Sequence, residues 1–81
     1  MNAEHLAEMV NDIANFFAIE PDHNVAIDSV CNHLRKFWDP RMRRQIIAYV
    51  RDHGAGGMSE LARAGVEKLA TIDPAPLAKT A

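Results

Sequence analysis

Hydrophobic residues recur every three or four positions along most of the chain, the spacing that places side chains on one face of an α-helix. The first stripe covers residues 6–17 and the second covers residues 27–38. A third stripe covers residues 42–53, and a weaker fourth covers residues 61–69. Because none of these segments alternates strictly between apolar and polar residues, the pattern predicts helices and no strands.

Proline, glycine and capping residues mark the predicted ends of these helices. Glu20-Pro21 should stop the first helix, since the residue before a proline is pushed out of the α region. The second helix is predicted from about residue 23 to Trp38, with Asp22 or Asn24 available as its N-cap. Asp39-Pro40 then ends one helix and starts the next, because Asp is a favoured N-cap and Pro is favoured at the first helical position. The second and third helices should therefore meet at a tight corner.

The last part of the chain shows a glycine-rich turn and then a less regular segment. The run at 54–57 should end the third helix, and Ser59 should cap the fourth. Gly65 weakens the fourth helix by about 1 kcal/mol relative to alanine. We therefore expect an all-α fold, a small bundle of three main helices plus a shorter fourth C-terminal helix. Residues 1–70 should form a single helical domain and residues 71–81 a flexible C-terminal tail.

Composition supports one small globular domain and gives little sign of catalytic chemistry. The chain has 81 residues, 48% of them hydrophobic, and a single cysteine, Cys31, which excludes an intramolecular disulfide and fits a reducing compartment. Four scattered histidines offer no convergent ligands for a metal. Cys31 lies on an apolar stripe, where a core residue is expected rather than a nucleophile. We predict no catalytic residues, no metal and no cofactor.

The amino-terminal residues lack the basic and apolar regions of a secretory signal, and no segment approaches the roughly 20 apolar residues that span a bilayer. We therefore expect a cytoplasmic protein without a membrane partner. Charge is separated along the sequence despite a net value of −2. Residues 1–28 contain six acidic side chains and no Lys or Arg, whereas residues 35–51 contain six basic ones against Asp39. Such asymmetry affects partner choice more than fold.

Adjacent apolar pairs predict a surface that the bundle does not cover by itself. Neighbouring helix positions point about 100° apart, so each pair widens the apolar face. The pairs are Phe16-Phe17, Phe37-Trp38 and Ile46-Ile47. Aromatic and arginine side chains are common energetic anchors of interfaces, and the segment RKFWDPRMRR combines both. We expect its indole and guanidinium groups to be available to another macromolecule.

The run NHLRKFWDPRMRRQIIAYV at 32–50, MVNDIANFFAIEPD at 9–22 and GAGGMSELARAGVEKL at 54–69 together resemble the delta subunit family of NAD-dependent, molybdenum-containing formate dehydrogenases. The resemblance implies a non-catalytic accessory subunit of a soluble enzyme whose molybdenum-pterin cofactor and iron–sulfur clusters reside in the alpha subunit. It further implies docking on that alpha subunit, within a complex with beta and gamma subunits. Its expected role is assembly, maturation or stability of the complex.

The predicted partner interface lies at the corner between the second and third helices. Its residues are Asn32, His33, Arg35, Phe37, Trp38, Asp39, Pro40, Arg41, Arg43 and Arg44. Within it, Phe37 and Trp38 are expected as apolar anchors.

Two other interpretations remain open at this point. The second and third helices could form a helix-turn-helix that binds nucleic acid, although a pI near 6.0 and the short corner speak against it. Self-association, with an acidic first helix against a basic third helix of another copy, is compatible with the docking role and would give a homodimer.

Overall fold

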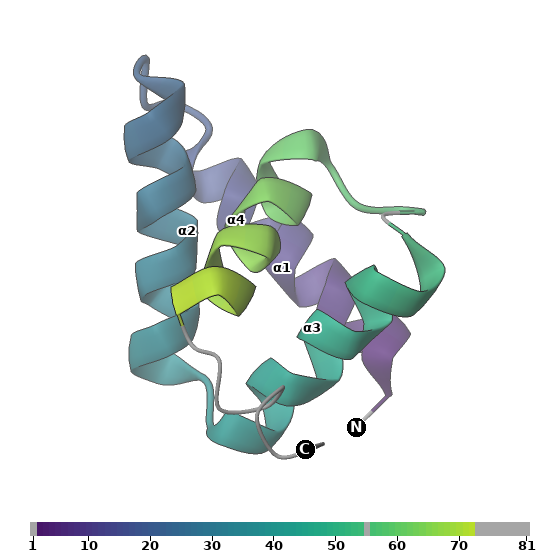
Figure 1. Ribbon diagram of the computed structural model, residues 1–81. Coiled ribbons are helices and arrows are strands. Elements are labelled where there is room, and N and C mark those ends of the chain that lie inside the picture. The colour runs from purple at the N-terminus through teal and green to yellow at the C-terminus, as the bar shows by residue number, and fades with distance from the viewer. Residues whose placement is uncertain (1, 55, 73–81) are drawn as a thin grey trace.

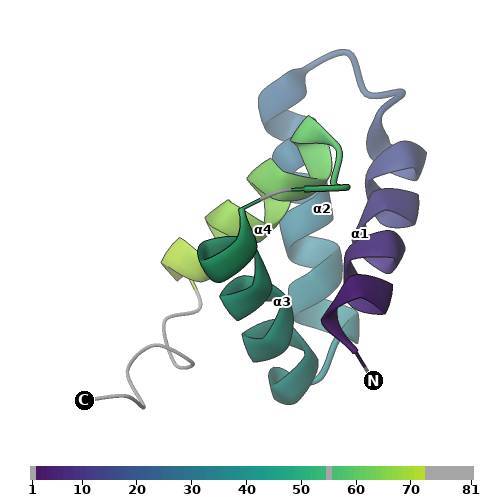
Figure 2. The same ribbon diagram turned by 90° about the vertical axis from the view of Figure 1, so that its right-hand side faces the viewer.

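Four α-helices make up the fold in a computed structural model that describes residues 2–54 and 56–72 (Figure 1). Their bounds are α1 (Ala3–Phe17), α2 (His23–Phe37), α3 (Pro40–His53) and α4 (Glu60–Ile72). The described residues contain no strand, and the predicted all-α class is confirmed. Helix α4 lies between α2 and α3 in the view of Figure 1, in front of α1, and it packs against all three, most extensively against α2 (Figure 2).

The capping residues predicted from the sequence are in place. The Asp22 carboxylate accepts hydrogen bonds from the backbone N–H groups of Asn24 and Val25, at 3.0 and 3.3 Å. Asp39 accepts from the N–H of Met42 at 2.9 Å, with Pro40 as the first residue of α3. The Ser59 hydroxyl accepts from the N–H of Ala62 at 3.1 Å. These bonds satisfy donors that a helix start otherwise leaves unpaired.

Two helix ends differ from the prediction. Helix α1 ends at Phe17, before the Glu20-Pro21 signal, and the Glu20 N–H closes a turn onto the Phe17 carbonyl at 3.0 Å. Helix α2 ends at Phe37 rather than at Trp38, which has extended dihedral angles, φ −92° and ψ 138°. The chain thus turns one residue earlier than expected, although the Trp38 N–H still donates to the Leu34 carbonyl at 3.0 Å.

All four helices contribute to one hydrophobic core. Its fully buried large side chains are Leu6, Val10, Val30, Leu34, Ile46, Val66 and Leu69. Cys31 is 1% exposed, so its predicted place in the core is confirmed. At the centre of α4, Gly65 allows close approach to α2: a Cβ atom there would lie 2.4 Å from Val30 Cγ1. An ion pair between Lys68 and Asp28 joins the same two helices at the surface, and its hydrogen bond raises the pKa of Lys68.

The α3–α4 connection is held by a side chain from α1. The Asn11 amide donates to the Gly57 carbonyl at 2.8 Å, and its oxygen accepts from the Ser59 N–H at 2.9 Å. Gly54 and Gly57 adopt positive φ values of 70° and 82°, which favour glycine. Asn11 thereby fixes the loop just where α4 begins.

The predicted tail falls mostly outside the described residues. Thr71 and Ile72 belong to the last turn of α4, and residues 73–81 lie beyond the described part. No helix formed by residues 2–54 and 56–72 is long and apolar enough to cross a membrane.

Candidate functional site

Trp38 is part of the core, and the expectation that its indole stays available to a partner is wrong. Its side chain is 5% exposed and belongs to the same buried cluster as Leu34 and Ile46. Phe37 is 71% exposed, so the apolar side chain presented to solvent at this corner is the phenylalanine. Trp38 lies four residues after Leu34 and seven after Cys31, and its N–H still donates to the Leu34 carbonyl at 3.0 Å, so its side chain continues the buried stripe of α2. Phe37 follows the half-buried His33 by one turn and faces solvent.

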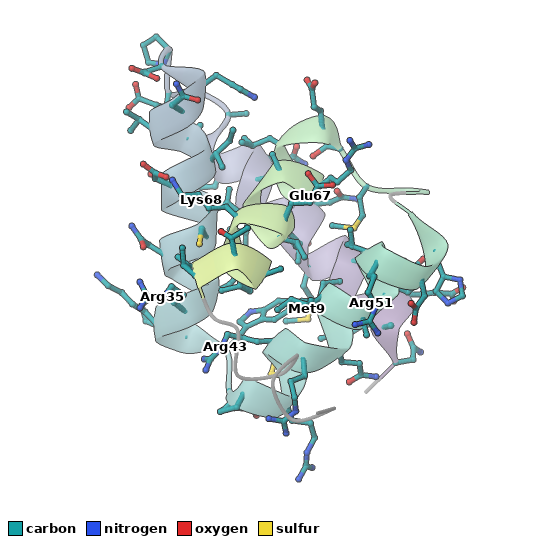
Figure 3. The ribbon with its side chains drawn as sticks, in the orientation of Figure 1. Met9, Arg35, Arg43, Arg51, Glu67 and Lys68 are labelled. Atoms are coloured by element: carbon teal, nitrogen blue, oxygen red, sulfur yellow. The ribbon has the colours of Figure 1, made fainter. Side chains whose placement is uncertain are left out.

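Arg43 holds the corner together from the first turn of α3. Its guanidinium Nη1 donates to the Trp38 carbonyl at 2.6 Å and to the Arg35 carbonyl at 3.4 Å. Figure 3 shows Arg43 reaching from α3 toward the end of α2. Carbonyl groups at a helix end lack partners within the helix and carry partial negative charge, so a cation there is favourable. Arg43 therefore acts as a C-terminal cap of α2.

Replacing Arg43 by methionine should destabilise the fold by about 1–3 kcal/mol, because the partly buried Trp38 carbonyl loses a charged donor while the apolar stem is kept. Urea unfolding followed by circular dichroism measures the loss. Arg44→Met is the matched control, since Arg44 is exposed. Equal midpoints for the two variants would show that the cap contributes nothing.

Three other arginines form what we call the basic corner: Arg35, Arg41 and Arg44. All three side chains are exposed. Within residues 2–54 and 56–72, none of them makes an ion pair, including with the acidic residues of α1. Arg41 and Arg44 line a shallow hollow with Asp39 and Pro40. The guanidinium groups of the basic corner are therefore free to meet an acidic partner.

Four rings form a continuous aromatic face where α1 and α2 lie side by side. They are Phe16, Phe17, His33 and Phe37. Successive ring centroids along this series are 5.1, 6.3 and 4.8 Å apart. Phe16 is 71% exposed, like Phe37. So much exposed aromatic surface on a small domain is typical of a binding site.

The predicted interface residues that belong to α2 fall on two sides of that helix. Asn32, His33 and Phe37 line the aromatic face, whereas Arg35 lies two positions from both His33 and Phe37 and so points about 160° away from them. Figure 3 shows Arg35 on the outer side of α2. The α1 half of the face was missing from the predicted interface. Its signal was the Phe16-Phe17 pair, in which, as in Phe37-Trp38, one ring packs inward and the other faces solvent.

No arrangement for metal binding is found among the described side chains, where no three His, Cys, Asp or Glu residues come together. The hollows of the surface are lined chiefly by apolar, aromatic and basic groups. Aromatic and arginine side chains are common energetic anchors of macromolecular interfaces.

A comparison with protein families gives a match that covers most of the chain. Residues 5–66 match the family of the NADH-dependent formate dehydrogenase delta subunit, FdsD. The matched region runs from the first turn of α1 into α4 and includes both the aromatic face and the basic corner. No curated protein and no solved structure matches the chain.

Proposed function

The chain belongs to the NADH-dependent formate dehydrogenase delta subunit family, and from this premise we propose that it is a non-catalytic accessory subunit that docks on the catalytic alpha subunit. In this role it acts in the cytoplasm, within a complex that also contains beta and gamma subunits. It supports the assembly, maturation or stability of the enzyme and binds no cofactor itself. The proposed contacts are the predicted interface residues that face solvent, while Trp38 and Arg43 support them from within.

The observation that carries the proposal is the basic corner. Arg35, Arg41 and Arg44 have no carboxylate partner within the described part of the chain. They lie on a corner that the Asp39 cap and the Arg43 cap hold in one conformation. Arginine pairs with carboxylates through two parallel hydrogen bonds, and because the two caps fix the backbone of the corner, the entropy lost on binding is that of the side chains. An acidic surface on a partner subunit fits this corner.

Reversing two charges of the basic corner should weaken binding to the alpha subunit. In an Arg41→Glu/Arg44→Glu variant, the attraction to carboxylates becomes repulsion, and we expect affinity to fall at least about tenfold. Titration of the purified alpha subunit with the complete delta chain measures the affinity. Co-expression then reports the yield of cofactor-loaded alpha subunit, which should fall as well.

The matched control is Arg51→Glu/Arg63→Glu, which makes the same change of charge at sites where each arginine already pairs with a neighbour, Asp52 or Glu67. Its affinity should stay close to that of the wild type. If the two double variants bind equally, the basic corner is not the docking surface. If the wild-type chain fails to bind the alpha subunit at all, the docking role itself is wrong.

The helix-turn-helix interpretation is not favoured. In that motif the two helices pack on each other and present the second to the DNA groove. Here α2 packs chiefly on α4, and α3 packs on α4 and α1 (Figure 1). The family match also points to a subunit of an oxidoreductase complex.

A further inference from the structure

Two hollows lie side by side on the aromatic face, with Phe17 and His33 as their shared wall. The first is lined by Asp12, Ile13 and Phe16 beside that wall and has a volume of about 380 Å³. The second is lined by Asn32, Lys36 and Phe37, with Ser29, and has a volume of about 250 Å³. Each has room for a large apolar side chain. The face can therefore accept two large apolar side chains of a partner, one on each side of the Phe17–His33 pair.

Opposite charges flank the two hollows. Asp12 lines the first and Lys36 lines the second. Both side chains are exposed, and neither makes an ion pair or hydrogen bond within the described residues. An occupant that places a cation beside Asp12 and a carboxylate beside Lys36 would match this pattern in only one direction. The face therefore has a negatively charged end and a positively charged end, with apolar side chains between them.

The mode of contact follows from the elements present. The described residues offer no strand edge, so a partner cannot bind by adding a strand and has to contact side chains. An amphipathic helix presents large apolar side chains at intervals of three, four or seven residues and can straddle a wall between two hollows. The alternative occupant is a second copy of the chain related by a two-fold axis, and sedimentation of the isolated chain distinguishes the two.

We infer that the aromatic face binds an amphipathic helix of the alpha subunit, which places one large apolar side chain in each hollow, a basic residue beside Asp12 and an acidic residue beside Lys36. This inference rests on the proposed docking role and adds the surface, the chemistry of the partner segment and its direction. The basic corner, formed by Arg35 of α2 with Arg41 and Arg44 of α3, then supplies steering and further ion pairs. The aromatic face supplies most of the affinity.

Removal of the exposed rings tests the surface. A Phe16→Ser/Phe37→Ser variant should bind the purified alpha subunit about 30-fold more weakly, because interface anchors dominate binding energy. The matched control is Val25→Ser/Ile72→Ser, which changes two other exposed apolar side chains, 44% and 42% exposed, outside both hollows. Circular dichroism should show equal helicity for both variants. Equal affinities would overturn the inference while leaving the docking role intact.

Charge reversal tests the direction of binding. Asp12→Lys and Lys36→Glu should each weaken binding about three- to tenfold, and their combination should weaken it further, since both ends then repel the helix. Glu8→Lys and Arg63→Glu make equivalent changes outside the hollows and should have little effect. Unchanged binding by the Asp12 and Lys36 variants would overturn the assigned direction.

Sedimentation of the isolated delta chain separates the remaining outcomes. A monomer whose binding to the alpha subunit depends on Phe16 and Phe37 supports the inference. A dimer that Phe16→Ser/Phe37→Ser converts to monomers would assign the face to a second copy instead and overturn the inference. Failure of the wild-type chain to bind the alpha subunit would remove the docking role, a result distinct from selective failure of the ring variants.

Discussion

A Trp38→Ala variant is expected to lose about 3–5 kcal/mol of stability, the usual cost of truncating a large aromatic side chain in a core. The indole is 5% exposed and packs in the cluster that contains Leu34 and Ile46. A domain of this size has a total stability of about 4–12 kcal/mol. We therefore expect the variant to be partly or wholly unfolded at room temperature. Loss of docking would follow from loss of the fold.

Phe37→Ala is the matched control for this experiment. Phe37 directly precedes Trp38 but is 71% exposed, so its truncation should change stability by no more than about 0.5 kcal/mol. Thermal and urea unfolding of both variants measures the difference. A Trp38→Ala chain that stays as stable as Phe37→Ala and loses only partner binding would contradict the core position and restore the indole as an interface anchor.

The local features of the fold could be read from the sequence because their causes are local. Asp39-Pro40 combines a side-chain acceptor with a fixed φ, and both act within one turn of α3. Ser59 caps α4 in the same way. The apolar stripes predicted the helices equally well, because a helix that buries one face repeats its apolar residues with a period of 3.6.

The choice between Phe37 and Trp38 could not be made from the pattern. Both side chains fit a widened apolar stripe. Neighbouring positions point about 100° apart, so one of the two can face the core while the other faces solvent. The indole of Trp38 packs in the core cluster that includes Ile46 of α3, while Phe37 faces solvent. Arg43 caps the Trp38 carbonyl from the next helix. The contacts that distinguish the two side chains are thus tertiary, between elements whose relative placement the sequence alone leaves open.

Asn11 illustrates the same limit at longer range. Its amide bonds Gly57 and Ser59, which are 46 and 48 residues away in the chain. Nothing in the first stripe distinguishes Asn11 from the other polar residues of α1. Likewise, the aromatic face joins Phe17 of α1 to His33 of α2, so only the packing of the two helices reveals it. Predicted interface residues on α2 therefore captured one half of the surface and omitted the other.

A Gly65→Ala variant should be destabilised by about 1–3 kcal/mol, although alanine is the better helix former by about 1 kcal/mol. The new Cβ atom would lie 2.4 Å from Val30 Cγ1 and 2.8 Å from Val30 Cβ. Valine in a helix has essentially one χ1 rotamer, so it cannot turn aside, and α2 and α4 would have to separate. Because α4 packs on all three other helices, that separation disturbs the whole core.

Gly56→Ala is the control, because its φ is not in the left-handed region and no atom would lie within 4 Å of the added methyl group. Its stability should equal or slightly exceed that of the wild type. A Val30→Ala change in the Gly65→Ala background removes the closest contact, so the double variant should lose less than the sum of the two single changes. Urea unfolding of the four chains gives this coupling. Strict additivity, or a Gly65→Ala chain more stable than the wild type, would show that helix propensity outweighs the α2–α4 contact at this position.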